Sequence, residues 1–92
     1  MESLQKQLEV LFVQAGADHA EAYFDSDGED PEWPMWYADH MLESLRELLA
    51  SNFTKSDLVY LLVQASREHG LRAPGSNRAR FYARFFLERY DF

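Results

Sequence analysis

Residues 54–70 read TKSDLVYLLVQASREHG, and this stretch says more about the fold than any other part of the chain. Its apolar side chains recur at helical spacing: Leu58, Val59, Leu61, Leu62 and Ala65. Such spacing, with few β-branched residues, indicates an amphipathic helix and not a strand. Thr54 followed by Asp57 is the pattern of a capping box at a helix start. We therefore predict a helix that Thr54 caps, that runs through His69 and that stops at Gly70.

The segment before it carries the same kind of pattern. Residues 51–53 are a short break, and residues 34–50 before it carry a second apolar stripe at helical spacing. Pro34 lies in the first turn of this predicted helix, where proline is favoured. An acidic stretch at 25–32, rich in turn formers and without apolar residues, predicts a loop.

Two further helical segments lie towards the ends of the chain. Residues 2–15 carry an apolar stripe that Gly16 could end, and Asp18 with Glu21 then resembles a capping box for a second piece through Phe24. The sequence leaves open whether residues 2–24 form one helix or two. A linker at 70–77 precedes a last helix at 78–90, with Ser76 or Asn77 as its cap.

No pair of strands joined by a hairpin turn is recognisable in this sequence. We therefore predict an all-α fold, a compact bundle of four helices, or of five if the chain breaks at Gly16. With 92 residues, one domain spanning 1–92 is expected.

The composition favours a cytoplasmic protein. The chain contains no cysteine, which excludes disulfides, thiolate-bound metals and a cysteine nucleophile. Small secreted domains usually depend on such cross-links. The first residues lack the basic region and continuous apolar run of a signal peptide. No apolar stretch approaches the roughly 20 residues that span a membrane, so we expect no membrane attachment.

Charge is divided unevenly along the chain. The net charge is −7, but residues 1–66 hold thirteen acids against three bases, whereas residues 67–92 hold six arginines against three acids. An acidic body repels phosphate backbones, which argues against general nucleic-acid binding. Protein surfaces of opposite charge are better candidates for the arginine-rich end.

Three segments together resemble uncharacterised small bacterial helical proteins that contain a Trp-Pro-x-Trp-Tyr-Ala segment. They are PEWPMWYA at 31–38, TKSDLVYLL at 54–62 and FYARFF at 81–86. The resemblance spans roughly residues 20–90. It implies a bacterial cytosolic protein and carries no activity, cofactor or site residue.

Acidic residues and histidines were considered as metal ligands. Asp25 and Asp27 alternate beside Gly28, as in calcium loops, but the glycine falls two positions early for an EF-hand and Trp36 stands where the bidentate glutamate belongs. His40 and Glu43 share one helix face, and His19 also follows an acidic residue. Helical bundles that bind two metals need more such pairs, so solvated turns and surface histidines are favoured over a metal site.

Catalytic motifs are missing from the sequence. It has no Gly-x-Ser-x-Gly elbow, no phosphate-binding glycine loop and no strand–turn–helix unit for a dinucleotide. We therefore expect no catalytic residue, no cofactor and no enzymatic activity.

The candidate partner-binding residues are aromatic side chains and arginines, the types enriched at interface hot spots. They are Trp33, Trp36, Arg80, Phe81, Arg84, Phe85 and Tyr90. The last helix places six rings in twelve positions, more than one helix face can readily bury. The alternative interpretation is that the rings face the core while the arginines pair with the acidic body.

Three functional hypotheses follow. The leading one is a helical interaction or accessory protein that binds a protein partner or itself as a homodimer. The second is a bundle that binds a metal or small ligand through histidines and carboxylates. The third is a nucleic-acid-associated regulator that uses the arginine-rich last helix, with Arg80 and Arg84 as contacts.

Overall fold

The computed structural model describes residues 3–26 and 30–90 and places four α-helices and one short 3₁₀ turn in them. The helices are α1 (Leu4–Ala22), α2 (Trp33–Leu49), α3 (Lys55–Arg72) and α4 (Arg78–Tyr90), and the 3₁₀ turn η1 is Phe24–Ser26. No strand occurs in the described residues, so the prediction of an all-α four-helix bundle is confirmed.

Helices α1, α3 and α4 each begin at a residue whose side chain caps the helix. Ser3 Oγ accepts a hydrogen bond from the Lys6 amide at 3.1 Å. The predicted capping box of α3 is present in full: Thr54 Oγ1 accepts from the Asp57 amide at 3.1 Å, and Asp57 Oδ2 accepts from the Thr54 amide at 2.9 Å. At α4, Asn77 supplies the cap, accepting from the Arg80 amide at 2.9 Å. These bonds satisfy amides that have no partner inside the helix.

Both helix stops predicted at glycine are wrong. Helix α1 continues through Gly16, and α3 continues through Gly70 as far as Arg72. The described part of residues 2–24 holds one α-helix, α1, and Asp18 and Glu21 lie inside it. A glycine in a helix interior costs about 1 kcal/mol relative to alanine. Buried side chains lie close to each glycine, Ala15 and His19 around Gly16 and Ala65 and His69 before Gly70, and their packing outweighs so small a cost.

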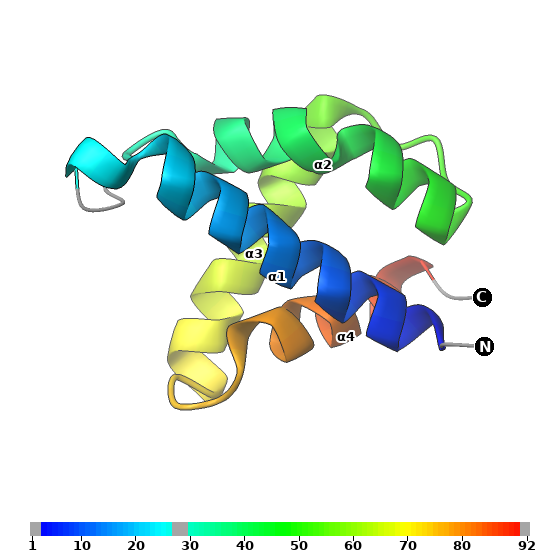
Figure 1. Cartoon of the computed structure of the whole chain (residues 1–92). Helices are drawn as coiled ribbons and strands as arrows, with labels where there is room; N and C mark the ends of the chain where they lie inside the picture. Colours follow the sequence, from blue (N-terminus) through cyan, green and yellow to red (C-terminus); the bar gives the residue numbers. More distant parts are fainter. Residues whose placement is uncertain (1–2, 27–29, 91–92) are drawn as a thin grey trace.

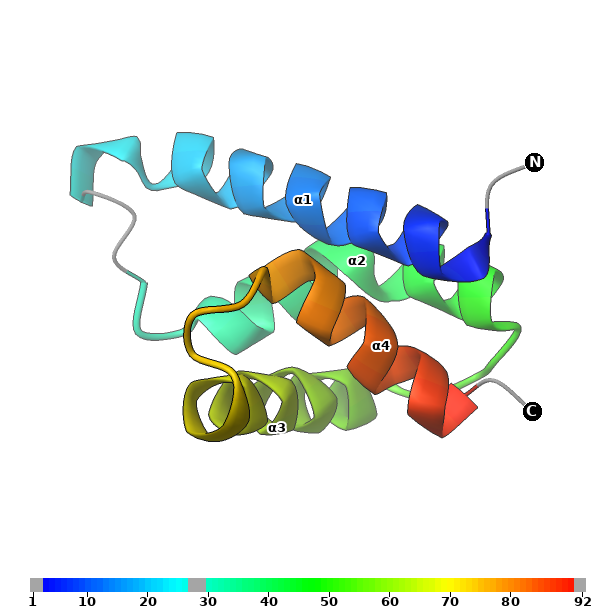
Figure 2. The ribbon, with the colours of Figure 1, turned by 90° about the horizontal axis from the view of Figure 1, so that it is seen from below.

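The helices surround one core in the order α1, α2, α3, α4, each in contact with the next and α4 in contact with α1 (Figure 1). Helix α3 crosses the direction of α1 steeply, so the bundle is not a set of parallel rods (Figures 1 and 2). Figure 2 shows the start of α1 and the end of α4 at one end of the molecule and η1 at the other. The radius of gyration is 12.8 Å, close to the roughly 12 Å expected for a compact chain of this length.

The core is made of side chains from all four helices and the α2–α3 connection. Those with the lowest exposure and largest volume are Leu8, Met41, Leu45, Leu58, Leu62 and Phe86. Among the described residues, no helix has the length and apolar character needed to cross a membrane.

Candidate functional site

Two hollows with different chemistry are formed by the helices. The first, which we call the basic groove, lies between the end of α3, the 73–77 connection and α4, and encloses about 600 Å³. Four arginines and two glutamates line it, so the lining carries net positive charge. They are Arg72, Arg80, Arg84, Arg89, Glu68 and Glu88.

Ion pairs hold three of the four arginines in place. Glu68 bridges Arg72 at 3.3 Å and Arg89 at 3.5 Å. Arg80 Nε donates to Glu9 Oε1 of α1 at 3.1 Å. Arg84 is exposed and forms no ion pair with any residue in 3–26 or 30–90. One arginine in the groove is therefore left to meet a negative charge from elsewhere.

The floor of the basic groove is aromatic. The guanidinium of Arg89 lies 3.6 Å from the centre of the Phe85 ring, a cation–π contact. Phe81 is half-buried and packs its ring on that of His69, with 5.2 Å between the centroids. The groove therefore combines cations with ring surface, as the sequence predicted for this segment.

The expected surplus of unburied rings on α4 is largely absent. Phe85 is only 5% exposed and Phe86 is fully buried, so Phe85 cannot serve as an exposed partner-binding side chain. Helix α4 contacts both α1 and α3, and it therefore buries two faces, not one. Tyr90 packs on Phe53 with ring centroids 5.1 Å apart and is half-buried. Phe85 and Phe86 therefore need no neighbouring molecule to cover them, whereas Phe81 and Tyr90 stay partly exposed and Phe92 lies outside the described residues.

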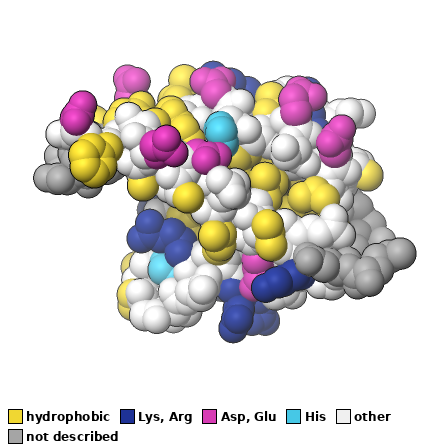
Figure 3. Space-filling model, viewed as in Figure 1, with side chains coloured by type: hydrophobic (Ala, Val, Ile, Leu, Met, Phe, Trp, Pro, Cys, Tyr) yellow, Lys and Arg dark blue, Asp and Glu magenta, His cyan; other side chains and the backbone are white. Residues whose placement is uncertain are grey.

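Acidic and basic side chains occupy different parts of the surface. In Figure 3 most of the visible acidic side chains lie over α1 and α2, and most of the visible basic ones lie below them, beside α3 and α4. The division found along the chain is thus also a division in space, because α1 and α2 come from its acidic part.

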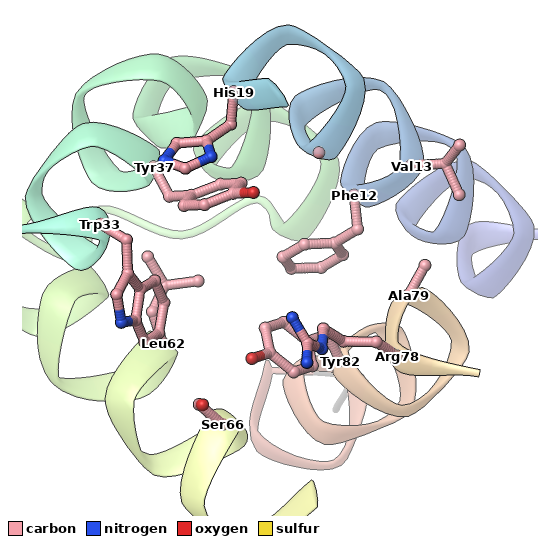
Figure 4. Close-up of a pocket in the computed structure, with 11 residues that line it drawn as sticks. Phe12, Val13, His19, Trp33, Tyr37, Leu62, Ser66, Arg78, Ala79 and Tyr82 are labelled. Atoms are coloured by element: carbon pink, nitrogen blue, oxygen red, sulfur yellow. The ribbon is translucent and has the colours of Figure 1, made fainter. Parts of the chain in front are cut away.

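The second hollow, which we call the ring-lined pocket, lies where α1 and the starts of α2 and α4 approach α3, and encloses about 530 Å³ (Figure 4). Its walls are mainly aromatic. Phe12 and Tyr82 meet edge to face with centroids 5.5 Å apart, and Trp33 and Tyr37 do the same at 6.0 Å. No aspartate or glutamate lines this pocket among the described residues, and Arg78 is the one arginine that does.

Polar groups enter the ring-lined pocket from α3 and α4. Figure 4 shows Tyr82, Ser66 and Arg78 directed into the space between the rings. Burial raises the pKa of the Tyr37 hydroxyl, and the nearby charge of Arg78 opposes that rise. The Arg78 side chain itself is exposed to solvent.

The histidines of α1 and α2 belong to two separate pairs with aspartates. His19 Nε2 lies 3.2 Å from Asp30 Oδ2, with both side chains nearly buried, and its ring stacks between Tyr23 and Tyr37. His40 Nε2 lies 2.8 Å from Asp18 Oδ2 on the surface. This hydrogen bond from His40 is the main reason why the pKa of Asp18 lies below its ordinary value.

The predicted metal ligands are not brought together. His19 and His40 have different carboxylate partners, and Glu43 points into solvent, 3.5 Å from Arg46. Asp25 is exposed, and Asp27 lies outside the described residues. Within 3–26 and 30–90, no three side chains of metal-binding type form a group.

The two tryptophans do not join the basic groove. Trp33 lines the ring-lined pocket. Trp36 is half-buried, stacks on His40 with 4.7 Å between centroids and meets His19 edge to face. The seven predicted partner-binding residues therefore divide among several places, and the groove contains Arg80, Phe81, Arg84 and the buried Phe85.

Sequence reasoning missed part of each hollow. Arg72 and Arg89 of the basic groove carried a detectable signal, since Glu68 and Arg72 stand four residues apart on one helix. The ring-lined pocket carried no such signal in the sequence, because its lining residues Phe12, Tyr37, Ser66 and Tyr82 come from four different helices.

Comparisons with known proteins add nothing to the description of this chain by its fold class and its two hollows. No model of a protein family matches it, and neither the curated proteins nor the solved structures contain a significant match. The resemblance to small bacterial proteins with a Trp-Pro-x-Trp-Tyr-Ala segment therefore stays a prediction.

Proposed function

We propose that this protein is an interaction module that binds an acidic segment of a different protein in the basic groove. The observation that carries the proposal is the convergence of four arginines and the Phe81 ring on one hollow between α3 and α4. Arginine and aromatic side chains dominate the binding energy of protein interfaces. The occupant expected is a carboxylate-rich segment that also offers an aromatic or aliphatic side chain.

The groove is suited to carboxylates because its cations are already positioned. Arg89 is held by Glu68 and by the Phe85 ring beneath it, so it loses little side-chain freedom when a ligand arrives. Arg84 has no ion pair within the described residues and is the arginine best able to receive a carboxylate from a partner. Planar guanidinium groups bind carboxylates through two parallel hydrogen bonds.

The acidic surface over α1 and α2 supports a protein partner over a nucleic acid. A phosphate backbone passing the groove would meet repulsion from this surface (Figure 3). A short acidic segment that ends within the groove would avoid it. The positive groove in an acidic molecule also favours one orientation of approach.

A peptide-binding experiment tests the proposal. The probe is a short dye-labelled peptide of glutamates around one tyrosine, and its matched control has glutamine at each glutamate position. Fluorescence anisotropy should show salt-sensitive binding of the glutamate peptide alone. Arg84→Glu should weaken it by about tenfold or more. Arg67→Glu, an equal charge change on exposed α3 outside the groove, should leave binding within about twofold.

Four results would contradict the proposal. Equal binding of both peptides would show that carboxylates are not recognised, and equal loss in both variants would show that the effect is general charge. Sedimentation that finds a dimer dissociated by Arg84→Glu would replace the separate partner by a second copy of the chain. Tighter binding of a single-stranded oligonucleotide than of the peptide would favour a nucleic-acid role.

A further inference from the structure

The ring-lined pocket is a second site, independent of the basic groove. Its volume of about 530 Å³ falls in the range of small-molecule sites, roughly 300–1,000 Å³. Such sites combine apolar walls with a few placed polar groups. Here the walls are the rings of Phe12, Trp33 and Tyr37, and the polar groups are those of Ser66, Arg78 and Tyr82, which occur together in no single segment of the chain.

We propose that this pocket binds a small organic carboxylate with a flat apolar body. The body lies between Phe12 on α1 and the Trp33–Tyr37 wall on α2, and the carboxylate meets Arg78 at the start of α4. Flat molecules suit the space because the edge-to-face ring pairs on both sides leave ring surface to pack against.

The charge at the pocket is the first argument for an anion. Arg78 forms no ion pair within the described residues, and no carboxylate lines the pocket there. Glutamates pair with three arginines of the basic groove, Arg72, Arg80 and Arg89, whereas none pairs with Arg78 among the described residues. Arg78 and Ala79 are also the first two residues of α4, a thirteen-residue helix whose positive end therefore faces the same space.

The unpaired hydroxyl of a largely buried tyrosine is the second and independent argument. Tyr82 is only 7% exposed, yet its hydroxyl forms no hydrogen bond with any described residue. No side-chain atom of the described part of the chain is fully buried without a partner, so this hydroxyl reaches the open space of the pocket. Figure 4 shows it directed towards that space. Buried polar groups are nearly always satisfied, so this one is suited to bonding a ligand or its water.

Gly16 leaves the space in front of the rings open. It lies in the middle of α1 and lines the pocket, and a Cβ added there would meet no atom within 4 Å. A leucine at this position would keep the helix and extend its side chain into the pocket. The substitution Gly16→Leu is therefore a way to fill the site without disturbing the basic groove.

Two probes that differ only in charge test the proposal. Naphthoate and the neutral naphthamide have nearly the same shape, and each is titrated into the folded protein with binding followed by NMR chemical shifts. Naphthoate should bind about tenfold or more tightly, as charge-assisted hydrogen bonds allow. The largest shifts should fall on Phe12, Trp33 and Tyr82.

Variants then assign the effect to the pocket. Arg78→Gln should reduce naphthoate binding to the level of naphthamide, whereas Arg67→Gln on the exposed side of α3 should change neither. Gly16→Leu should block both probes while circular dichroism shows an unchanged helix content. Equal affinity of the two probes, retention of the charge preference in Arg78→Gln, or shifts centred outside the pocket would each overturn the proposal. Absence of binding by both probes at millimolar concentration would also overturn it.

Discussion

The substitution Gly16→Ala changes the free energy of unfolding in opposite directions, depending on whether α1 ends at Gly16 or continues through it. If α1 ended at Gly16 in a left-handed turn, alanine would cost about 1–2 kcal/mol because its Cβ clashes there. In the structure Gly16 lies inside α1 and a Cβ would meet nothing within 4 Å. Alanine should then raise the free energy of unfolding by about 1 kcal/mol, through helix propensity and a smaller unfolded-state entropy.

The size of the effect can be converted into a melting temperature. A chain of 92 residues has an unfolding entropy near 0.19 kcal/mol/K at about 2.1 cal/mol/K per residue, so 1 kcal/mol corresponds to a rise of about 5 °C. The measurement is urea unfolding followed by circular dichroism at helical wavelengths, with the slope m compared between variant and parent. Gly70→Ala in α3 is a parallel case, since Gly70 also lies in a helix and a Cβ added there would meet no atom within 4 Å.

The outcome that refutes the reasoning is a lower urea midpoint for Gly16→Ala at unchanged m. That result would mean that α1 is interrupted at Gly16, and the ring-lined pocket, which Gly16 lines, would then have a different shape. A midpoint raised in both glycine variants would support continuous helices α1 and α3.

Three further predictions follow from local features. Leu8→Ala should lower the free energy of unfolding, measured with urea, by about 2–5 kcal/mol because Leu8 is fully buried. The control is Val10→Ala in the same helix: Val10 is 52% exposed, so this free energy should change by less than about 0.5 kcal/mol. Equal effects of the two substitutions would mean that the other face of α1 is in the core. Ala50 has a left-handed backbone conformation with φ of 48°, which glycine adopts without strain. Ala50→Gly should therefore raise the free energy of unfolding by about 0.5–1 kcal/mol, after the greater entropy of glycine in the unfolded chain is subtracted. Thermal unfolding measures this effect, and a lower Tm would refute the left-handed conformation at the end of α2. The hydrogen bond from His40 lowers the pKa of Asp18, so the stability that this bond gives the fold is present above the ordinary pKa of 3.8 and is lost as the pH falls. The free energies of unfolding of the parent and of His40→Ala should therefore become more alike at acid pH. A difference between them that stays constant with pH would contradict the pairing.

The candidate sites could be predicted only in part. Arg80, Phe81 and Arg84 of the basic groove stood out because they cluster within one helix, so their proximity needed no tertiary information. Trp36 and Phe85 were expected at a surface, but Phe85 is buried in the core, and Trp36 is half-buried and meets the His19 ring of α1. Whether a ring is exposed depends on which helices pack on both sides of it, and periodicity in one helix carries no information about that.

The amino-acid sequence by itself determined the all-α class, the starts of α3 and α4 and the division of charge. Helix starts depend on bonds between residues three or four apart, such as the Thr54–Asp57 box, and these can be recognised from spacing alone. Only the tertiary structure decided that α1 and α3 pass through Gly16 and Gly70, that α4 buries two faces, and that Arg78 and Tyr82 meet the rings of α1 and α2 in one pocket. The reason is that these features depend on contacts between residues far apart in the chain, where packing of whole helices outweighs local preferences of about 1 kcal/mol.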